Sequence, residues 1–598
     1  MLTKMPFVLI PQNMRPATLY INRGRCLLAV DVLSKIRWHS SAVRMDCPVV
    51  DTEAGKVRGS ASKIFTSKAI FSYRNLPYGR PPTGKRRFMP PEKALPWSGI
   101  QDCTMRTNIP MQTAFETEEM QYYTPSLFDG IGKMEERLTE DCLRLSIYTP
   151  VDFQDGKHPV MVWFYGGAFQ MGFADMFDGT VLSALHDVVV VIPNYRVGVF
   201  GFFSLGRNSP CTGNAGLLDQ RMALQWVQNN IGAFGGDKNN VTIFGESAGG
   251  CSVNHHVNSS MSSGLFHKAI SHSGQSTLAK IFKRDLTRAR ENLLEILDIN
   301  ETDPMERLNK LQNIPAEKLV KADFNMRMRF MAFNPTIDGV FVHEDPLKSL
   351  AYGPANKVPY IIGCNNSEGQ GMLTLLARVP GFVEGMTKQA AKVMLTNFLP
   401  RMSPSSLEEC QDACIDFYEK DPNDKFRYSK VYGDIYTDSM FVAPAVTTAK
   451  AHTEAGCPVY FYYATYQVKF NHDTEYGPNV AQKPDWCFCD HSDDIYMMWG
   501  APLVPGGISR GARFTEEEKE LSEKCMRYIT NFAKTGNPNV GETVDVHWPM
   551  YSTPGKYIEL DHEMRTKENL LPNNVKFWME KIPAITKKHE NDDRRARL

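Results

Sequence analysis

Residues 241–250 read VTIFGESAGG, a run that places one serine between small residues. A short apolar run leads into a Gly-x-Ser-x-Gly turn, and residues 251–257 continue as a plausible helix. Gly245 and Gly249 stand two residues before and after Ser247, where larger side chains would collide across a tight turn. The bare pattern also arises by chance in loops, but the strand before it and the helix after it favour a nucleophile. We predict that Ser247 projects at the carboxyl end of a sheet, at a helix N-terminus that favours negative charge.

Four further apolar runs resemble strands of the same sheet. They are residues 159–165 (PVMVWFY), 188–193 (VVVVIP), 358–363 (VPYIIG) and 458–463 (PVYFYY). Runs without alternation are typical of strands that helices cover on both faces. Residues 219–231 have helical spacing, and residues 280–330 and 376–425 are predicted to be helical insertions. The pattern predicts an α/β fold with a large, mostly parallel central sheet flanked by helices.

The overall composition excludes several classes of protein. Lys plus Arg and Asp plus Glu both number 67, so the net charge is zero, which argues against a nucleic-acid partner. Thirteen cysteines are too few for a disulfide scaffold in 598 residues. The sequence holds no apolar stretch of about 18 residues, so we expect no transmembrane segment.

The domain boundaries follow from the two ends of the chain. Residues 1–46 are rich in basic residues but lack the continuous apolar stretch of a signal peptide, so they form an uncertain N-terminal extension or targeting segment. Residues 47–585 are predicted to be one large domain, because no low-complexity linker or internal repeat divides them. Residues 586–598 are expected to form a charged C-terminal tail.

Backbone donors for an oxyanion are predicted after the first strong strand. Residues 159–165 run into Gly166, Gly167 and Ala168. Enzymes with a nucleophile at a strand-to-helix turn place N–H groups in a loop of this kind. We expect the N–H groups of Gly167, Ala168 and Ala248 to form the oxyanion hole; the alternative is a plain Gly-Gly turn.

The acid and the base should follow the nucleophile in that order along the chain. Glu368 comes just past the strand at 358–363, although it could also be a surface glutamate. Among the later histidines, His491 lies in a loop that leads into an aromatic helix; the alternative is a solvated loop histidine. We predict that His491 takes the proton of Ser247 and that Glu368 orients the imidazole.

Several motifs together resemble the type-B carboxylesterase/cholinesterase family over roughly residues 48–580. They are YGRPPTGKRRF (78–88), EDCL (140–143), NYRVG (194–198), GNAGLLDQ (213–220), AFGGD (233–237) and GESAGG (245–250). The resemblance implies an α/β-hydrolase fold and cleavage of carboxylic esters through an acyl-Ser247 intermediate, with Ser247, Glu368 and His491 as the triad. It also implies that Glu246 and Ser273 line the site and that Cys103 and Cys142 form a disulfide. The disulfide in turn favours secretion or the lumen of the secretory pathway.

Departures from the family pattern narrow the expected function. Residues 104–141 contain no tryptophan, which argues against an acetylcholine esterase, because cholinesterases hold the quaternary ammonium by cation–π attraction. Ser492 follows His491 where the family often has glycine. A small-molecule ester is the expected substrate, without a cofactor. A metal at residues 487–491 (CFCDH) would occupy the base, so we expect none. The alternatives are a lipase, or a binding or adhesion module with little or no catalysis on the same fold.

Overall fold

The computed structural model describes residues 47–64, 68–112, 134–152, 157–278, 282–327, 332–371, 379–396, 399, 404–478, 482–504 and 512–595. The expected extension at residues 1–46 therefore lies outside the described residues. No helix in the described ranges is long and apolar enough to cross a membrane.

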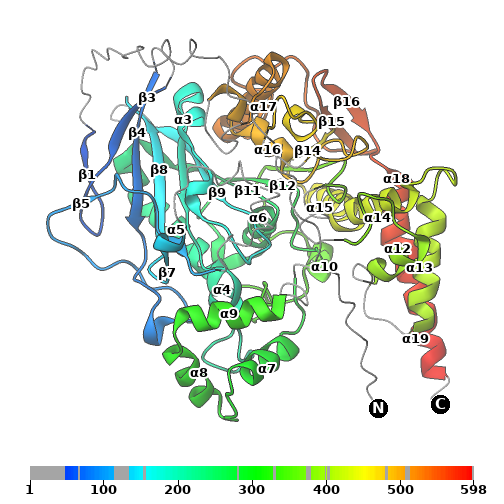
Figure 1. The fold of residues 1–598 in the computed structure, drawn as a ribbon. Helices are drawn as coiled ribbons and strands as arrows, with labels where there is room; N and C mark the ends of the chain where they lie inside the picture. Colours follow the sequence, from blue (N-terminus) through cyan, green and yellow to red (C-terminus); the bar gives the residue numbers. More distant parts are fainter. Residues whose placement is uncertain are drawn as a thin grey trace, which may run out of the picture. The chain divides into compact units, whose positions relative to one another are not determined.

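An eleven-stranded sheet forms the centre of the described domain (Figure 1). Its spatial order is β16 (Arg565–Glu568), β15 (Lys556–Leu560), β14 (Val459–Ala464), β13 (Tyr360–Asn365), β12 (Lys268–His272), β11 (Gly236–Glu246), β9 (His158–Phe164), β10 (Val189–Pro193), β8 (Arg144–Pro150), β4 (Lys68–Pro77) and β3 (Ser60–Ile64). All strands from β10 to β15 pair in parallel, whereas the pairs at both edges are antiparallel. The prediction of a large, mostly parallel sheet is confirmed.

Two small sheets lie outside the central one. The first joins β1 (Val49–Asp51), β2 (Lys56–Arg58) and β5 (Ile100–Asp102), and the second joins β6 (Ile109–Pro110) and β7 (Leu138–Thr139).

The helices fall into those that follow strands of the sheet and those inserted between them. The first set comprises α3 (Thr180–His186), α4 (Gly198–Phe202), α5 (Ala215–Asn230), α6 (Ala248–Asn258), α15 (Ala443–Glu454), α16 (Asp493–Met498) and α17 (Glu516–Thr535). The second comprises α7 (Thr287–Ile296), α8 (Pro304–Asn313), α9 (Ala316–Arg327), α10 (Pro346–Ser349), α12 (Lys388–Leu395), α13 (Pro404–Tyr418) and α14 (Arg427–Thr437). Figure 1 shows α7, α8 and α9 grouped together, and α12, α13 and α14 as a second group. Both predicted helical insertions are therefore present.

Short 3₁₀ and π segments complete the connections. They are η2 (Gly84–Arg86), η3 (Met134–Arg137), η4 (Ala174–Met176), η5 (Ile231–Phe234), η6 (Ser260–Ser262), η7 (Leu350–Tyr352), η8 (Asp438–Val442), η9 (Lys469–Asn471), η10 (Ala501–Leu503) and η11 (Phe577–Lys581). The π segment η8 joins α14 to α15 without a break, which places Phe441 beside the histidine loop.

The C-terminal residues continue as helix beyond the expected domain boundary. α18 (Pro572–Lys576) leads through η11 into α19 (Ile582–Arg595), and α19 packs against α13. Lys588 Nζ lies 3.2 Å from Glu409 Oε2, and His589 Nε2 lies 2.6 Å from the same oxygen. The boundary expected at residue 585 therefore falls inside a helix, and residues 586–595 belong to it.

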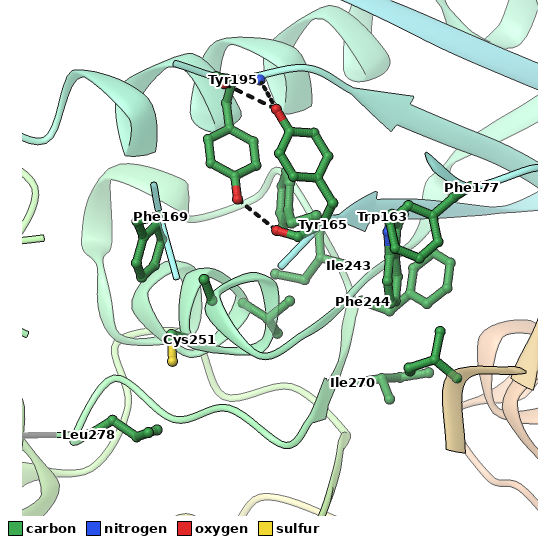
Figure 2. Close-up of a cluster of buried hydrophobic side chains, with 14 of the residues drawn as sticks. Trp163, Tyr165, Phe169, Phe177, Tyr195, Ile243, Phe244, Cys251, Ile270 and Leu278 are labelled. Carbon is green, nitrogen blue, oxygen red and sulfur yellow. Dashed lines mark hydrogen bonds between the residues drawn. The ribbon is translucent and has the colours of Figure 1, made fainter. Parts of the chain in front are cut away.

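Aromatic packing fixes the strand that precedes the glycine loop. Tyr165 and Tyr195 stack with ring centroids 4.4 Å apart, and each hydroxyl donates to the other residue's carbonyl, at 3.1 Å and 2.6 Å (Figure 2). Trp163, two residues earlier, contacts the rings of Phe177 and Phe244. All of these side chains are buried. The end of β9 is thereby held rigidly against its neighbours in the sheet.

Candidate active site

Ser247 stands at a sharp turn between β11 and α6. Its backbone has φ 56° and ψ −122°, a conformation that is strained for a residue with a side chain. A Cβ on Gly245 would lie 2.5 Å from the carbonyl carbon of Gly249, and one on Gly249 would lie 1.8 Å from the oxygen of Phe164. Both neighbouring positions therefore require glycine, as the sequence pattern indicated.

Backbone hydrogen bonds hold the turn to the adjacent strand. The Ser247 N–H donates to the carbonyl of His272 at 2.9 Å, and the Cys251 N–H donates to the Ser247 carbonyl at 2.9 Å. A Cβ on Gly274 would come within 2.0 Å of the Ser247 carbonyl oxygen, so the backbone after β12 lies directly against the turn. The serine is thus fixed from two sides while its side chain stays at the end of the sheet.

The glycine loop presents N–H groups that have no partner. Gly167 and Ala168 both have positive φ, at 105° and 57°. The loop is held by its carbonyls: Gly167 accepts from the N–H groups of Gln170 and Met171, and Ala168 accepts from Asn334 Nδ2 at 3.2 Å. Within the described ranges, the N–H groups of Gly167, Ala168 and Ala248 donate to no protein atom. Three ordered donors are therefore available to a ligand.

His491 and Glu368 form a buried hydrogen-bonded pair. His491 Nδ1 lies 2.5 Å from Glu368 Oε2, and 123 residues separate them in the chain. The other carboxylate oxygen of Glu368 accepts from the Asn365 N–H at 2.7 Å, at the end of β13. Both side chains are at most 2 % exposed. The acid is therefore fixed by its own strand and in turn fixes the imidazole.

The second nitrogen of the imidazole faces Glu246. His491 Nε2 lies 3.0 Å from Glu246 Oε1, and the Ser492 hydroxyl donates to that same oxygen at 2.7 Å. Across the described residues, no hydrogen bond joins the Ser247 hydroxyl to His491. The Glu246 carboxylate nevertheless lies close to the Ser247 side chain, because a Cβ on Gly166 would lie 2.7 Å from Glu246 Oε2 and 3.0 Å from Ser247 Cβ.

The two titratable groups at this point shift each other's protonation. Burial raises the pKa of Glu246 to about 7, and the nearby His491 and the Ser492 hydrogen bond oppose that rise. Burial lowers the pKa of His491, but Glu246 and Glu368 outweigh it and raise the pKa to about 9. Such perturbed groups in one buried cluster are typical of active sites.

Ser273 also lies beside the turn. It has φ 47°, its N–H donates to the Gly363 carbonyl at 2.9 Å, and its side chain is buried. Its hydroxyl has no hydrogen-bond partner in the residues that the structure describes. Ser273 therefore has a buried hydroxyl without a described partner, close to the turn that carries Ser247.

The expected disulfide between Cys103 and Cys142 is not formed in the described residues. Both side chains are buried free thiols, and the described cysteines form no disulfide. Burial raises the pKa of both thiols, and the charged groups that act on them differ: Asp102 and Arg144 at Cys103, Asp219 and Arg196 at Cys142.

Sequence reasoning missed Asn365, which connects the acid and base segments. Besides the N–H bond to Glu368, its side-chain Nδ2 donates to the Asp490 carbonyl at 2.7 Å and to Asp494 Oδ1 at 3.0 Å. Its place at the last residue of β13, three residues before the acid, was the available signal. No cluster of three or more His, Cys, Asp or Glu side chains that could hold a metal occurs in the described part of the chain.

The sheet, the strained serine turn and the buried acid–histidine pair define an α/β-hydrolase. Residues 46–578 match the Carboxylesterase family. Carboxylesterase 5A of Canis lupus familiaris is 37% identical over 544 residues, 90% of this chain and 90% of the relative. The liver carboxylesterase of Sus scrofa is 35% identical over 547 residues, 89% of this chain and 92% of the relative. A medium-chain fatty acyl-CoA hydrolase precursor of Anas platyrhynchos is 34% identical over 540 residues, 90% and 93% of the two chains.

The chain belongs to the carboxylesterase family. It is a serine ester hydrolase that acts on carboxylic esters. The relatives' names give no support to a binding module or a lipase in its place.

Proposed function

We propose that Ser247, Glu368 and His491 are the catalytic triad of this esterase and that Gly167, Ala168 and Ala248 supply its oxyanion hole. The observation that carries the proposal is the buried contact of 2.5 Å between His491 Nδ1 and Glu368 Oε2. It leaves Nε2 as the nitrogen that faces Glu246, the residue before Ser247. A histidine oriented in this way by an acid is the arrangement that activates a hydroxyl nucleophile.

The reaction then proceeds in two acyl-transfer steps. The Ser247 oxygen attacks the ester carbonyl while His491 Nε2 accepts the hydroxyl proton, and the carbonyl oxygen becomes an oxyanion. The intermediate collapses to the acyl-serine, and His491 returns the proton to the leaving alcohol. Water, deprotonated by the same nitrogen, attacks the acyl-serine and releases the carboxylic acid with Ser247 restored. Glu368 stabilises the imidazolium that exists between these proton transfers.

The three free N–H groups are suited to the oxyanion in both steps. The Ala248 N–H belongs to the first residue of α6, and those of Gly167 and Ala168 lie on the loop after β9. Preorganised donors of this kind contribute more than a flexible group, because they need no rearrangement as charge develops. Ala168 in place of a glycine leaves the N–H donor unchanged, since only the backbone takes part.

Glu246 and Ser273 line this centre. Glu246 lies at the nitrogen that the mechanism assigns to the Ser247 proton. The proposal therefore requires that the serine hydroxyl turn toward Nε2 when an ester is bound. Hydrogen bonds at active sites often become short only in the substrate complex.

Covalent labelling with a fluorophosphonate tests the nucleophile. Wild-type protein should be labelled and should hydrolyse 4-nitrophenyl esters, whereas Ser247→Ala should do neither. Ser260→Ala, which removes an exposed serine on η6, is the matched control and should behave as wild type. Labelling that persists in Ser247→Ala would refute the assignment.

Substitution of the base and acid completes the test. His491→Asn and Glu368→Gln should lower kcat by about 10³–10⁶-fold and about 10²–10⁴-fold. His547→Asn removes an exposed histidine and should leave kcat unchanged. Retained activity in His491→Asn would exclude that residue as the base.

We also propose that the protein acts in the secretory pathway or outside the cell. This location rests on the family alone, because Cys103 and Cys142 are free thiols. Sequencing the N-terminus of protein recovered from culture medium and from cell extract tests it; recovery in the cytosolic fraction alone would refute it.

A further inference from the structure

Lys483 places a buried positive charge beside the loop that carries His491. Its Nζ lies 2.7 Å from Asp490 Oδ2 and 3.3 Å from Asp493 Oδ1. The lysine side chain is 9 % exposed, and the two carboxylates are 0 % and 2 % exposed. Asp490 immediately precedes His491, and Asp493 follows it by two residues. One ammonium therefore contacts the carboxylates of residues that flank His491 on both sides in the chain.

Further hydrogen bonds close this loop around the lysine. The Asp490 N–H donates to Asp493 Oδ2 at 2.9 Å, so the two carboxylate residues are also joined to each other. Asn471 Nδ2 donates to Asp493 Oδ1 at 2.9 Å, and the Lys483 N–H donates to the Asn471 carbonyl at 2.8 Å. The backbone that positions His491 is thus built around a buried ion cluster.

The histidine is surrounded by acids from several elements. The titratable groups that act on it are Glu246 at the end of β11, Glu368 after β13, Asp490 on its own loop and Asp494 on α16. The groups that act with Lys483 are Asp490, Asp493, Cys487, His472 and Tyr496. Each ionised acid near the imidazole favours the protonated form of the imidazole. A general base, however, must be neutral to accept the serine proton.

We propose that Lys483 is a positioning residue of the esterase: its ammonium pairs with Asp490 and Asp493, fixes the backbone on both sides of His491, and offsets the field of these acids at the imidazole. The inference rests on the proposed role of His491 as the general base. It adds a residue that touches neither substrate nor the reacting atoms.

The ionisation of the cluster agrees with this role. Burial disfavours the charged form of Lys483, but Asp490 and Asp493 outweigh it and raise the pKa of the ammonium. Burial raises the pKa of Asp493, and Lys483 opposes that rise. Removing the lysine would therefore leave two buried carboxylates without this compensating charge, which is strongly unfavourable.

The pH dependence of kcat/KM for 4-nitrophenyl butyrate separates this role from a purely structural one. In Lys483→Met, kcat/KM at neutral pH should fall about 10–100-fold, and the acid limb should move to higher pH by on the order of one unit. Lys483→Arg keeps the charge and should return the limb toward its wild-type position. Lys268→Met is the matched control and should leave the acid limb unchanged. Lys268 is a buried lysine at the first residue of β12, whereas the serine turn lies beside the last residue, His272.

A second variant tests the electric field at His491 by removing a negative charge instead of a positive one. Asp493→Asn removes one negative charge two residues after His491 in the chain, so its acid limb should move to lower pH. The fluorophosphonate titre gives the fraction of competent sites, and all rates are expressed per site. A limb that stays in place in Asp493→Asn, or in folded Lys483→Met, would overturn the proposal.

Failure of the two proposals can be distinguished. If His491→Asn stays active, the assignment of the base fails, and the role of Lys483 fails with it. If His491→Asn is inactive while the Asp493→Asn and Lys483→Met limbs match wild type, only the role of Lys483 is refuted.

Discussion

The carboxylate of Glu246 lies 3.0 Å from His491 Nε2, while Glu368 lies 2.5 Å from the opposite nitrogen of the same ring. The imidazole is therefore held between two acids. Both acids stabilise its positive form, and together they raise the pKa of His491 to about 9 against the opposing effect of burial. In the proposed mechanism, this position of Glu246 would set the pH range in which His491 can act as the base.

Glu246→Gln should shift the activity profile toward acid. A base must be neutral to work, so wild-type kcat/KM should rise with pH up to about 9, the raised pKa of His491. Removing the Glu246 charge lowers that pKa, and the acid limb should move to lower pH by about one unit or more. The matched control is Glu542→Gln, because Glu542 lies 2.9 Å from the remote His186 and should not affect the profile. An acid limb at higher pH in Glu246→Gln than in the wild type would contradict this prediction.

Gly166→Ala should impair catalysis without removing any functional group. The added methyl would lie 2.7 Å from Glu246 Oε2 and 3.0 Å from Ser247 Cβ, so one of these groups must move. Displacement of a reacting group by a fraction of an ångström to one ångström should lower kcat/KM about 10–100-fold. Gly232→Ala is the control, because its methyl would meet no atom within 4 Å. Steady-state kinetics with equal activity for both variants would show that the site tolerates the methyl.

Asp219→Ala should destabilise the domain far more than loss of an exposed acid. Asp219 accepts from Arg196 Nη2 at 2.6 Å and Nε at 2.8 Å, and both side chains are buried. The variant leaves the arginine charge in the core without a partner, at a cost of about 3–5 kcal/mol in the free energy of unfolding. Urea denaturation measures it, with Glu563→Ala as the control, since its pair with Arg565 is exposed. A wild-type midpoint for Asp219→Ala would refute the expectation.

Cys103 and Cys142 should react with a thiol reagent without prior reduction. Both are free but buried, so alkylation should require unfolding in denaturant. Peptide mass spectrometry of unreduced, denatured and alkylated protein should find the label on each residue. A peptide pair linked through these two positions would restore the disulfide that the family resemblance implied.

The strands could be predicted wherever burial left an unbroken apolar run. The runs at 159–165, 188–193, 358–363 and 458–463 correspond to β9, β10, β13 and β14, with ends that differ by at most two residues. The central strand β12, KAISH, carried no such signal, because its lysine, serine and histidine are buried through specific hydrogen bonds. The charged residues after 585 favoured a tail, whereas contacts of Lys588 and His589 with Glu409 extend a helix there.

The sequence predicted which residues form the candidate site, but it did not predict their contacts. The order of nucleophile, acid and histidine along the chain pointed to Glu368 and His491, which the structure brings into contact. The approach of Glu246 to His491 and the cluster at Lys483 depend on side-chain directions across different elements. Local spacing carries no information about such directions.

Asn365 joins the segment of the acid to the segment of the base through one side chain and one peptide group. Loss of order at this one residue would therefore disturb the segments of both Glu368 and His491. Heating or denaturant that loosens the last residue of β13 releases both partners of the proton relay at once, so inactivation is abrupt rather than graded.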